Sequence, residues 1–173
     1  MTALLAAKAI LFDLRGYSQQ TCYLVGRYLV DKPQQFARLT RPDMRFSGTF
    51  QWANTSELSP LRSPKQYQGK VIILINEYTQ SQAEFTAMAF GSHPRATFVR
   101  SPTAGADGDI AWVPLPGGYR TAFSGLGVYY PDGRETQRVG IVPDVLVMPT
   151  VASIRQAQDE VLKRALELIQ AEK

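Results

Sequence analysis

The sequence predicts an α/β fold with a mainly parallel β-sheet, flanking helices and a β-hairpin. Three apolar runs, at residues 9–14, 71–76 and 95–100, have the length and composition of buried strands. An Ala-rich segment at residues 82–91 separates the second run from the third and predicts a helix. This strand–helix–strand order is typical of parallel sheets whose strands are joined by right-handed crossovers.

The remaining apolar segments predict the hairpin and two more helices. Short runs at residues 110–115 and 119–124 flank Pro116-Gly117-Gly118, so they predict two antiparallel strands joined by a tight turn. Residues 20–30 and 153–170 carry apolar side chains at helical spacing. The second of these helices is expected to dock its apolar stripe on the rest of the domain.

The stretch between the first two predicted strands is less regular. Residues 39–50 predict strand, with turn residues at Pro42-Asp43 and Ser47-Gly48. Residues 54–68 are polar and contain two prolines, so they predict a surface loop.

Length and composition fit one globular domain. Of the 173 residues, 45% are hydrophobic and 20% are charged, which is ordinary for a chain that can build its own core. No stretch approaches the roughly 18 continuous apolar residues of a membrane span. The net charge of +4 is spread along the chain, so nucleic acid is not an expected partner. The single cysteine, Cys22, excludes an internal disulfide.

Ser81 stands where the apolar run gives way, through a short polar turn, to the predicted helix at residues 82–91. A hydroxyl at a helix N-terminus lies beside free backbone N–H groups and the positive end of the helix dipole, which stabilise the oxyanion of acyl transfer. A plain helix cap explains the same pattern, with Glu84 completing a capping box that contributes about 0.5–2 kcal/mol. Taken alone, the pattern favours the cap.

A family resemblance changes this interpretation. The segment Ser81-Gln82-Ala83-Glu84 resembles the nucleophile region of the C-terminal processing (tail-specific) serine peptidases, the family that includes the tricorn core. Other segments agree with that family in order and spacing: Ala9–Arg15 (AILFDLR), Arg95–Gly105 (RATFVRSPTAG), Val113–Ser124 (VPLPGGYRTAFS), Tyr130–Asp144 (YPDGRETQRVGIVPD) and Gln158–Ile169. The resemblance covers most of the chain apart from residues 33–66, and it implies a crotonase/ClpP-like core.

The resemblance also implies an activity. A protein of this kind would be a serine endopeptidase that cleaves polypeptides through an acyl-enzyme on Ser81 and needs no cofactor. The backbone N–H of Gln82 would bind the oxyanion. Gln19-Gln20 stand where the family has two glycines, so the backbone N–H of Gly16 is the candidate for the second oxyanion donor.

The expected substrate path follows from the same likeness. The peptide would lie along the loop formed by Thr103, Ala104, Gly105 and Ala106. Ser81 and residues 102–108 are therefore expected to line one cleft, with the turn at residues 16–20 on its opposite wall.

The general base is missing from the positions where the resemblance places it. One branch of the family uses a lysine in the loop after the next strand, and Ala106 stands there. The tricorn-like branch takes a histidine from upstream of the Asp-Leu-Arg strand, and this chain begins almost at that strand. Residues 1–173 are therefore expected to form one peptidase core domain that lacks its N-terminal portion and is inactive in isolation. An N-terminal region or a partner subunit would supply the base, and the resemblance implies an extracytoplasmic location in bacteria.

Other candidate site residues have plainer interpretations. His93 lies near the far end of the helix that Ser81 opens, roughly 15–18 Å away, so it is expected to interact with the helix dipole. Glu135 and Gln137 precede the Gly-Ile-Val-Pro-Asp loop, and either could orient a base by hydrogen bonding. Solvated hairpin residues fit that pattern as well.

Two short segments carry charged residues close together in the sequence. Asp107-Gly108-Asp109 carries too few ligands for calcium or magnesium, and no Cys/His set suits zinc, so no metal is expected. Asp13 and Arg15 fit either a structural ion pair or two solvated charges.

Two other functions compete with the peptidase. A non-catalytic peptide- or ligand-binding module on the same fold is favoured by Ala106 and by Gln19-Gln20. A crotonase-like acyl-CoA enzyme would need a site for the CoA phosphates, and the sequence offers neither a Gly-rich phosphate loop nor clustered Lys and Arg.

Overall fold

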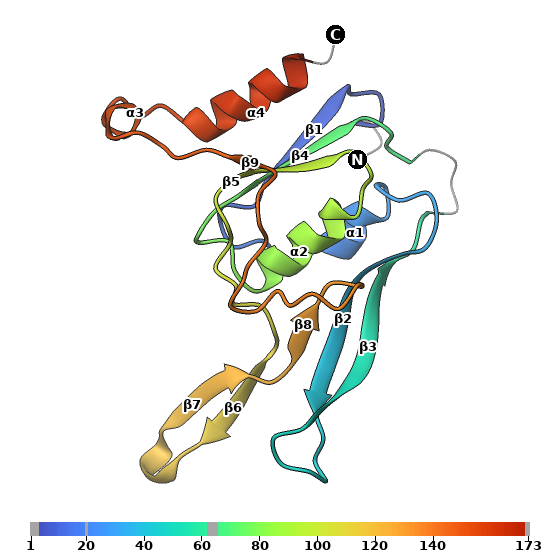
Figure 1. The fold of residues 1–173 in the computed structure, drawn as a ribbon, viewed down its shortest axis with the longest axis vertical. Helices are drawn as coiled ribbons and strands as arrows, with labels where there is room; N and C mark the ends of the chain where they lie inside the picture. The colour runs from blue at the N-terminus through green and yellow to red at the C-terminus, as the bar shows by residue number, and fades with distance from the viewer. Residues whose placement is uncertain (1–3, 20, 62–65, 172–173) are drawn as a thin grey trace.

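The central element of the fold is a four-stranded parallel sheet. The computed structural model describes residues 4–19, 21–61 and 66–171 (Figure 1). The sheet has the strand order β1-β4-β5-β9, and its members are β1 (Ala9–Asp13), β4 (Lys70–Ile75), β5 (Ala96–Arg100) and β9 (Val145–Leu146). The three apolar runs form the first three of these strands, so the predicted α/β fold with a mainly parallel sheet is confirmed.

Helices cover both faces of this sheet. Within residues 71–75 of β4, the odd-numbered side chains join one apolar cluster with α2 (Gln82–Gly91). The even-numbered ones join a second cluster with α4 (Glu160–Gln170). All five side chains are fully buried, because successive residues of a strand face opposite sides and both sides are covered. Figure 1 shows α2 and α4 on opposite sides of the strands.

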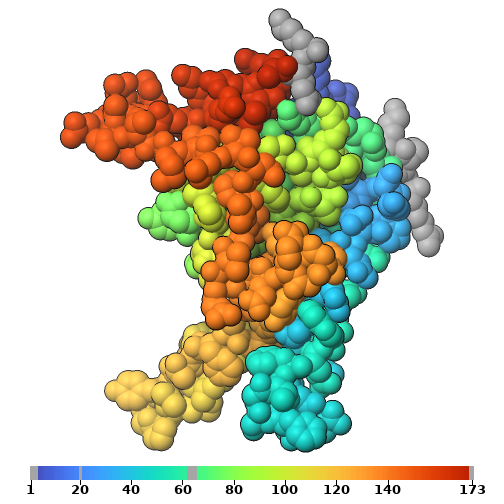
Figure 2. Space-filling model, in the orientation of Figure 1, coloured from blue at the N-terminus to red at the C-terminus, as the bar shows by residue number. Residues whose placement is uncertain are grey.

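A second, antiparallel sheet begins beside α2. β2 (Gln34–Pro42) lies between β3 (Phe50–Leu58) and β8 (Gly127–Tyr129) and pairs with both. The ends of β2 and β3 extend beyond the body of the protein as one arm (Figures 1 and 2).

The predicted hairpin forms a second arm. β6 (Ile110–Pro114) and β7 (Arg120–Ser124) are antiparallel, and the 3-10 turn η2 (Pro116–Gly118) joins them. Figure 2 shows this arm projecting from the same end of the molecule as the β2–β3 arm. The hairpin prediction is confirmed, including its turn.

The N-terminal half departs from the sequence prediction in the second sheet. The loop expected at residues 54–68 is wrong for residues 54–58, which complete β3, and residues 62–65 lie outside the described part of the chain. β3 is an edge strand with mostly exposed side chains, so its polar sequence lacks the apolar alternation that would reveal a strand. The strand expected at residues 39–50 is the end of β2, a turn and the first residue of β3.

The predicted helix at residues 20–30 is much shorter in the structure. α1 spans Cys22–Gly26, and residue 20 lies outside the described residues.

None of the helices in the described ranges is long and apolar enough to cross a membrane.

The predicted helix at residues 153–170 is divided in two. α3 spans Val151–Arg155, and α4 begins only after Asp159, whose side chain accepts the N–H of Leu162. Between the two helices Ala157 adopts a φ of 52°, which no α-helix contains. The Asp159 cap therefore starts a new helix where the apolar periodicity suggested a continuous one.

Candidate active site

Ser81 lies between β4 and α2 on a tightly hydrogen-bonded turn. The Asn76 side chain accepts the N–H groups of Tyr78 and Thr79, and the Thr79 hydroxyl donates to the carbonyl of Leu14 at 2.7 Å. Ser81 adopts φ 50° and ψ −122°, a conformation that costs a non-glycine residue about 1–3 kcal/mol. Strain of this kind at a strand-to-helix turn is typical of a nucleophile held above the edge of a sheet.

Glu84 holds the Ser81 turn in place from inside the protein. Its side chain is fully buried. Oε2 accepts the N–H of Ser81 at 3.1 Å and the N–H of Ala106 at 2.9 Å. Oε1 accepts the Thr103 hydroxyl at 2.5 Å and the Gly105 N–H at 2.8 Å. The carboxylate therefore makes the predicted capping contact and also fastens the nucleophile turn to a loop about twenty residues further along the chain.

The backbone N–H groups of residues 103–106 are all bonded within the chain. The N–H of Thr103 donates to the carbonyl of Ile141, and that of Ala104 donates to the carbonyl of Thr79. The other two N–H groups donate to Glu84. In this conformation the segment offers no N–H group to a peptide strand, so any direct contact with substrate would use its carbonyls or side chains.

A second loop packs against this segment without spare room. The N–H of Ile141 donates to the Thr103 hydroxyl oxygen at 2.7 Å. Gly140 has a φ of 75°, and a Cβ at that position would lie 2.6 Å from the carbonyl oxygen of Thr103. The Gly-Ile-Val-Pro-Asp loop, the residue 103–106 loop and the Ser81 turn are therefore one continuous packed unit.

Ser81 lines a cavity of about 470 Å³. Tyr17, from the turn after β1, stands on the same cavity, as do Asp107 and Gly108 from the loop after β5. The apolar part of the wall includes Trp112 of the hairpin arm. The cavity brings together the nucleophile turn, the end of the loop after β5 and the turn that begins at residue 16. Residues 102–106 do not line it, although the whole 102–108 loop was expected to; Gly105 and Ala106 line a different cavity of about 530 Å³.

Asp107 is the most perturbed acid of the cavity. It is only 5% exposed, and burial, aided by the charge of Glu84, raises its pKa to about 7. Its Oδ1 accepts the N–H of Gly108 at 2.8 Å. Its Oδ2 is buried and has no hydrogen-bond partner among the described residues. A buried carboxylate oxygen without a partner is rare in folded proteins, and such oxygens occur at catalytic sites.

The family relationship follows from a comparison of the whole chain. The model of peptidase family S41 matches residues 7–147. The chain belongs to peptidase family S41. Members of the family are serine peptidases, so the resemblance to the C-terminal processing peptidases is confirmed. No curated protein sequence matches the chain.

Solved structures with the S41 fold resemble the chain over almost all its length. A protein from Parabacteroides merdae, described as a candidate peptidase, has a TM-score of 0.85 and 22% identity over 96% of this chain and 53% of its own. Mature CPAF in complex with lactacystin has a TM-score of 0.77 and 17% identity, with coverage of 99% and 46%. The photosystem II D1 C-terminal processing protease has a TM-score of 0.65 and 21% identity, with coverage of 87% and 37%. The chain thus spans about half or less of each of these proteins, and at these identities the likeness shows the fold.

Gln82, Gly16 and Gln137 have different local environments. Gln82 is the first residue of the ten-residue helix α2, where backbone N–H groups have no partner within the helix. Gly16 is exposed in the turn just before Tyr17. The Gln137 amide donates to the carbonyls of Asp107 at 2.7 Å and Leu126 at 2.9 Å. Gln137 therefore braces the Asp107 loop, and the roles of all three in catalysis remain predictions.

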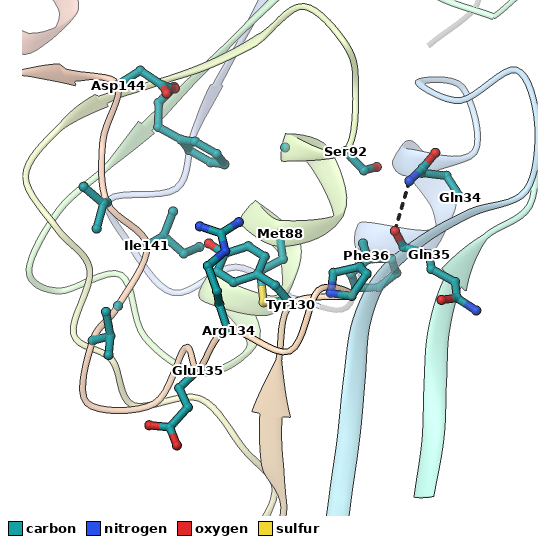
Figure 3. A pocket seen from close by; sticks show the side chains of 16 residues that line it. Gln34, Gln35, Phe36, Met88, Ser92, Tyr130, Arg134, Glu135, Ile141 and Asp144 are labelled. Atoms are coloured by element: carbon teal, nitrogen blue, oxygen red, sulfur yellow. Dashed lines mark hydrogen bonds between the residues drawn. The ribbon is translucent and has the colours of Figure 1, made fainter. Parts of the chain in front are cut away.

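Glu135 lies in a different part of the molecule from Ser81. It is exposed, pairs with Arg138 at 3.5 Å, and lines a separate cavity of about 620 Å³. Figure 3 shows this cavity, where Arg134 stands beside Met88 of α2 and the Glu135 side chain points away from Met88. The two cavities share no lining residue, so a role for Glu135 beside Ser81 would need another group between them.

His93 is a structural residue of the loop after α2. Its Nδ1 accepts the N–H of Arg95 at 3.1 Å, so Nε2 carries the proton and donates to the carbonyl of Tyr67 at 3.2 Å. Burial lowers its pKa, so the ring is neutral at pH 7. The expected interaction of a protonated His93 with the helix dipole is therefore absent at that pH.

Arg15 links the end of β1 to the start of α4. Its guanidinium pairs with Asp13 at 2.6 Å and with Asp159 at 2.8 Å, which selects the ion pair over two solvated charges. The hydrogen bond from Arg15 holds the pKa of Asp13 below its usual range. Within the part of the chain that the structure describes, no group of three or more His, Cys, Asp or Glu side chains is placed to hold a metal ion.

Sequence reasoning missed two features of the site. Asp107 lies in the loop of residues 102–108 that is expected to line the cleft, but no local pattern reports that its side chain is buried. Trp112 joins the cavity from the hairpin arm, whose direction depends on distant contacts, whereas Tyr17 lies in the turn expected on the opposite wall. Ala106, which departs from the family pattern, stands one residue before Asp107.

Proposed function

We propose that this chain carries the nucleophile of a serine peptidase and that Ser81 attacks the peptide carbonyl to form an acyl-enzyme. The strained Ser81 backbone beside a cavity is the observation that carries the proposal, because strain at a half-buried serine that lines a cavity needs a compensating role. Family membership supports the same chemistry.

Three groups would act around Ser81. The N–H of Gln82 points from the start of α2 and, with the helix dipole, would stabilise the oxyanion. The N–H of Gly16 would be the second donor. The loop from Thr103 to Ala106 would support the site from behind through Glu84, and its carbonyls would meet an extended polypeptide substrate.

Peptide turnover by this chain alone is expected to be slow. No Lys or His is among the described residues that line the Ser81 cavity, so the two usual bases for a serine nucleophile are missing there. A group from an N-terminal region or a partner subunit would raise the rate.

The test is labelling by a fluorophosphonate, which reacts with activated serine hydroxyls. We expect label on the wild-type chain, located at Ser81 by peptide mapping, and no label on Ser81→Ala. A Ser92→Ala variant is the control, because Ser92 is a helix-end serine whose hydroxyl donates to the carbonyl of Ala89. Its labelling should equal that of wild type.

A non-catalytic binding module is the second candidate, and Ala106 favours it. A folded wild-type chain that takes no label at Ser81 would overturn the peptidase proposal. Binding of an extended peptide by that same chain, measured by calorimetry, would then support the module.

A further inference from the structure

The starting point is the unpartnered oxygen of Asp107. One carboxylate oxygen of Asp107 is satisfied by the Gly108 N–H, whereas Oδ2 is buried and bonded to nothing among the described residues. Leaving such an oxygen without a donor costs free energy that a structural aspartate would avoid. Asp109, two residues away, accepts the N–H of Ile110 in the same manner but is exposed. The burial is therefore particular to Asp107.

The hydrogen bonds of Glu84 place Asp107 close to Ser81. The N–H groups of Ser81 and Ala106 donate to the same oxygen, Oε2, at 3.1 and 2.9 Å. The two nitrogens therefore lie at most about 6 Å apart, and Asp107 is the residue that follows Ala106. Asp107 and Ser81 also line the same cavity. The nucleophile and the carboxylate thus come from two segments that one buried side chain holds together.

We propose that Asp107 is the general base for Ser81, an inference that rests on the proposed peptidase function. As Ser81 Oγ bonds to the substrate carbonyl carbon, its proton passes to Asp107 Oδ2 and the carbonyl π electrons move to the oxygen. The tetrahedral intermediate then expels the amine, which takes the proton from Asp107, and an ester on Ser81 remains. Water attacks this ester, its proton passes to Asp107, and the proton returns to Ser81 Oγ when the acid leaves.

The electrostatic setting suits this role. A base is most effective when its pKa lies near the working pH, and burial raises the pKa of Asp107 to about 7. Part of the population is thus ionised at neutral pH. Asp107 lines two cavities, and the other ionisable residues on their walls are Tyr17, Asp109, Tyr129 and Arg138. Glu84 is the further ionisable group that acts on Asp107. The Glu84 charge raises the Asp107 pKa further.

Contacts from Gln137 and around Gly108 hold the loop that carries the Asp107 carboxylate. Gln137 donates to the backbone carbonyl of Asp107, and a Cβ on Gly108 would lie 2.7 Å from the Gln137 amide nitrogen and 2.8 Å from the carbonyl oxygen of Leu126. Gly108 also has a φ of 112°, which favours glycine. The loop is therefore held by contacts on both sides of the acid that must accept the proton.

The experiment measures the second-order rate of fluorophosphonate labelling at Ser81 between pH 5 and pH 9, on the full chain. Wild type should show a rate that rises with pH and levels off above an inflection near 7. Asp107→Asn keeps the shape of the side chain and should lower the rate at pH 8 by roughly 100-fold or more, with no inflection near 7. Asp132→Asn is the matched control and should keep the wild-type rate and profile, because Asp132 is exposed, pairs with Arg134 and lines neither cavity of Asp107. Thermal melting of each variant shows whether it is folded.

The outcomes separate this inference from the proposed function. Labelling that requires Ser81 but is unchanged in Asp107→Asn would overturn the role of Asp107 and leave the peptidase proposal standing. A slower Asp107→Asn variant that keeps the wild-type inflection would assign Asp107 a structural role and also overturn it. A folded wild-type chain without label at Ser81 would overturn both. If Asp107→Asn does not fold, a wild-type profile without an inflection near 7 is enough to refute the base.

Discussion

Removing the Glu84 carboxylate should destabilise the protein far more than the loss of a helix cap. Glu84 accepts four hydrogen bonds, from Ser81, Thr103, Gly105 and Ala106, and is fully buried. Hydrogen bonds to a charged group contribute about 1.5–3 kcal/mol each, and donors left unpaired in the interior add a desolvation cost. Because such contributions are not additive, we expect Glu84→Ala to lose at least about 4 kcal/mol of unfolding free energy.

The assay is urea unfolding at pH 7, with the free energy obtained by linear extrapolation. A loss of 4 kcal/mol is a large part of the roughly 5–15 kcal/mol that stabilises an ordinary domain, so Glu84→Ala should be close to unfolding at 25 °C. Glu84→Gln keeps the shape but turns an amide NH₂ toward backbone donors, so its loss should lie between that of Glu84→Ala and zero.

Glu160 provides the matched control. It also stands in the first turn of a helix and accepts hydrogen bonds, from the Thr150 N–H and the Ser153 hydroxyl, but it lies at the surface. Glu160→Ala should therefore lose much less than Glu84→Ala, since water can replace the carboxylate. If Glu84→Ala loses no more than the roughly 2 kcal/mol of a capping box, the reasoning that the carboxylate joins two loops is refuted.

Three further predictions concern the same unit. Ser81→Gly should raise the melting temperature by roughly 2–4 °C, because glycine relieves the strain of φ 50°, whereas no gain would mean that the turn stores no strain. Gly140→Ala should lower the free energy of unfolding more than Gly133→Ala does, and it should also slow the labelling of Ser81. A Cβ at residue 140 would meet the Thr103 carbonyl, whereas a Cβ at residue 133 would have open space around it. Equal losses in urea unfolding would contradict this. Asp107→Asn should gain stability relative to wild type as the pH rises from about 4 to about 7. The folded pKa of Asp107 is raised above its unfolded value, so the wild type loses stability over that range, by up to about 4 kcal/mol; a difference in melting temperature that does not change with pH would count against it.

Local sequence patterns determined the central part of this fold. β4 is a continuous apolar run and α2 is rich in small and apolar residues, so the local sequence already indicates that both are buried. The position of Ser81 followed from the junction between them, and the order of the family motifs added the class of chemistry. The hairpin arm was predictable because its turn residues, Pro116-Gly117-Gly118, act on their immediate neighbours.

Tertiary structure alone decided the edge strand and the environment of the site. β3 forms because β2 offers it hydrogen bonds, not because its polar sequence favours a strand. Glu84 looked like half of a capping box, and only the folded chain brings the loop of residues 103–106 to its carboxylate. Folding also buries Asp107 and raises its pKa, since desolvation depends on which atoms surround a group in space and not on which residues adjoin it in the chain.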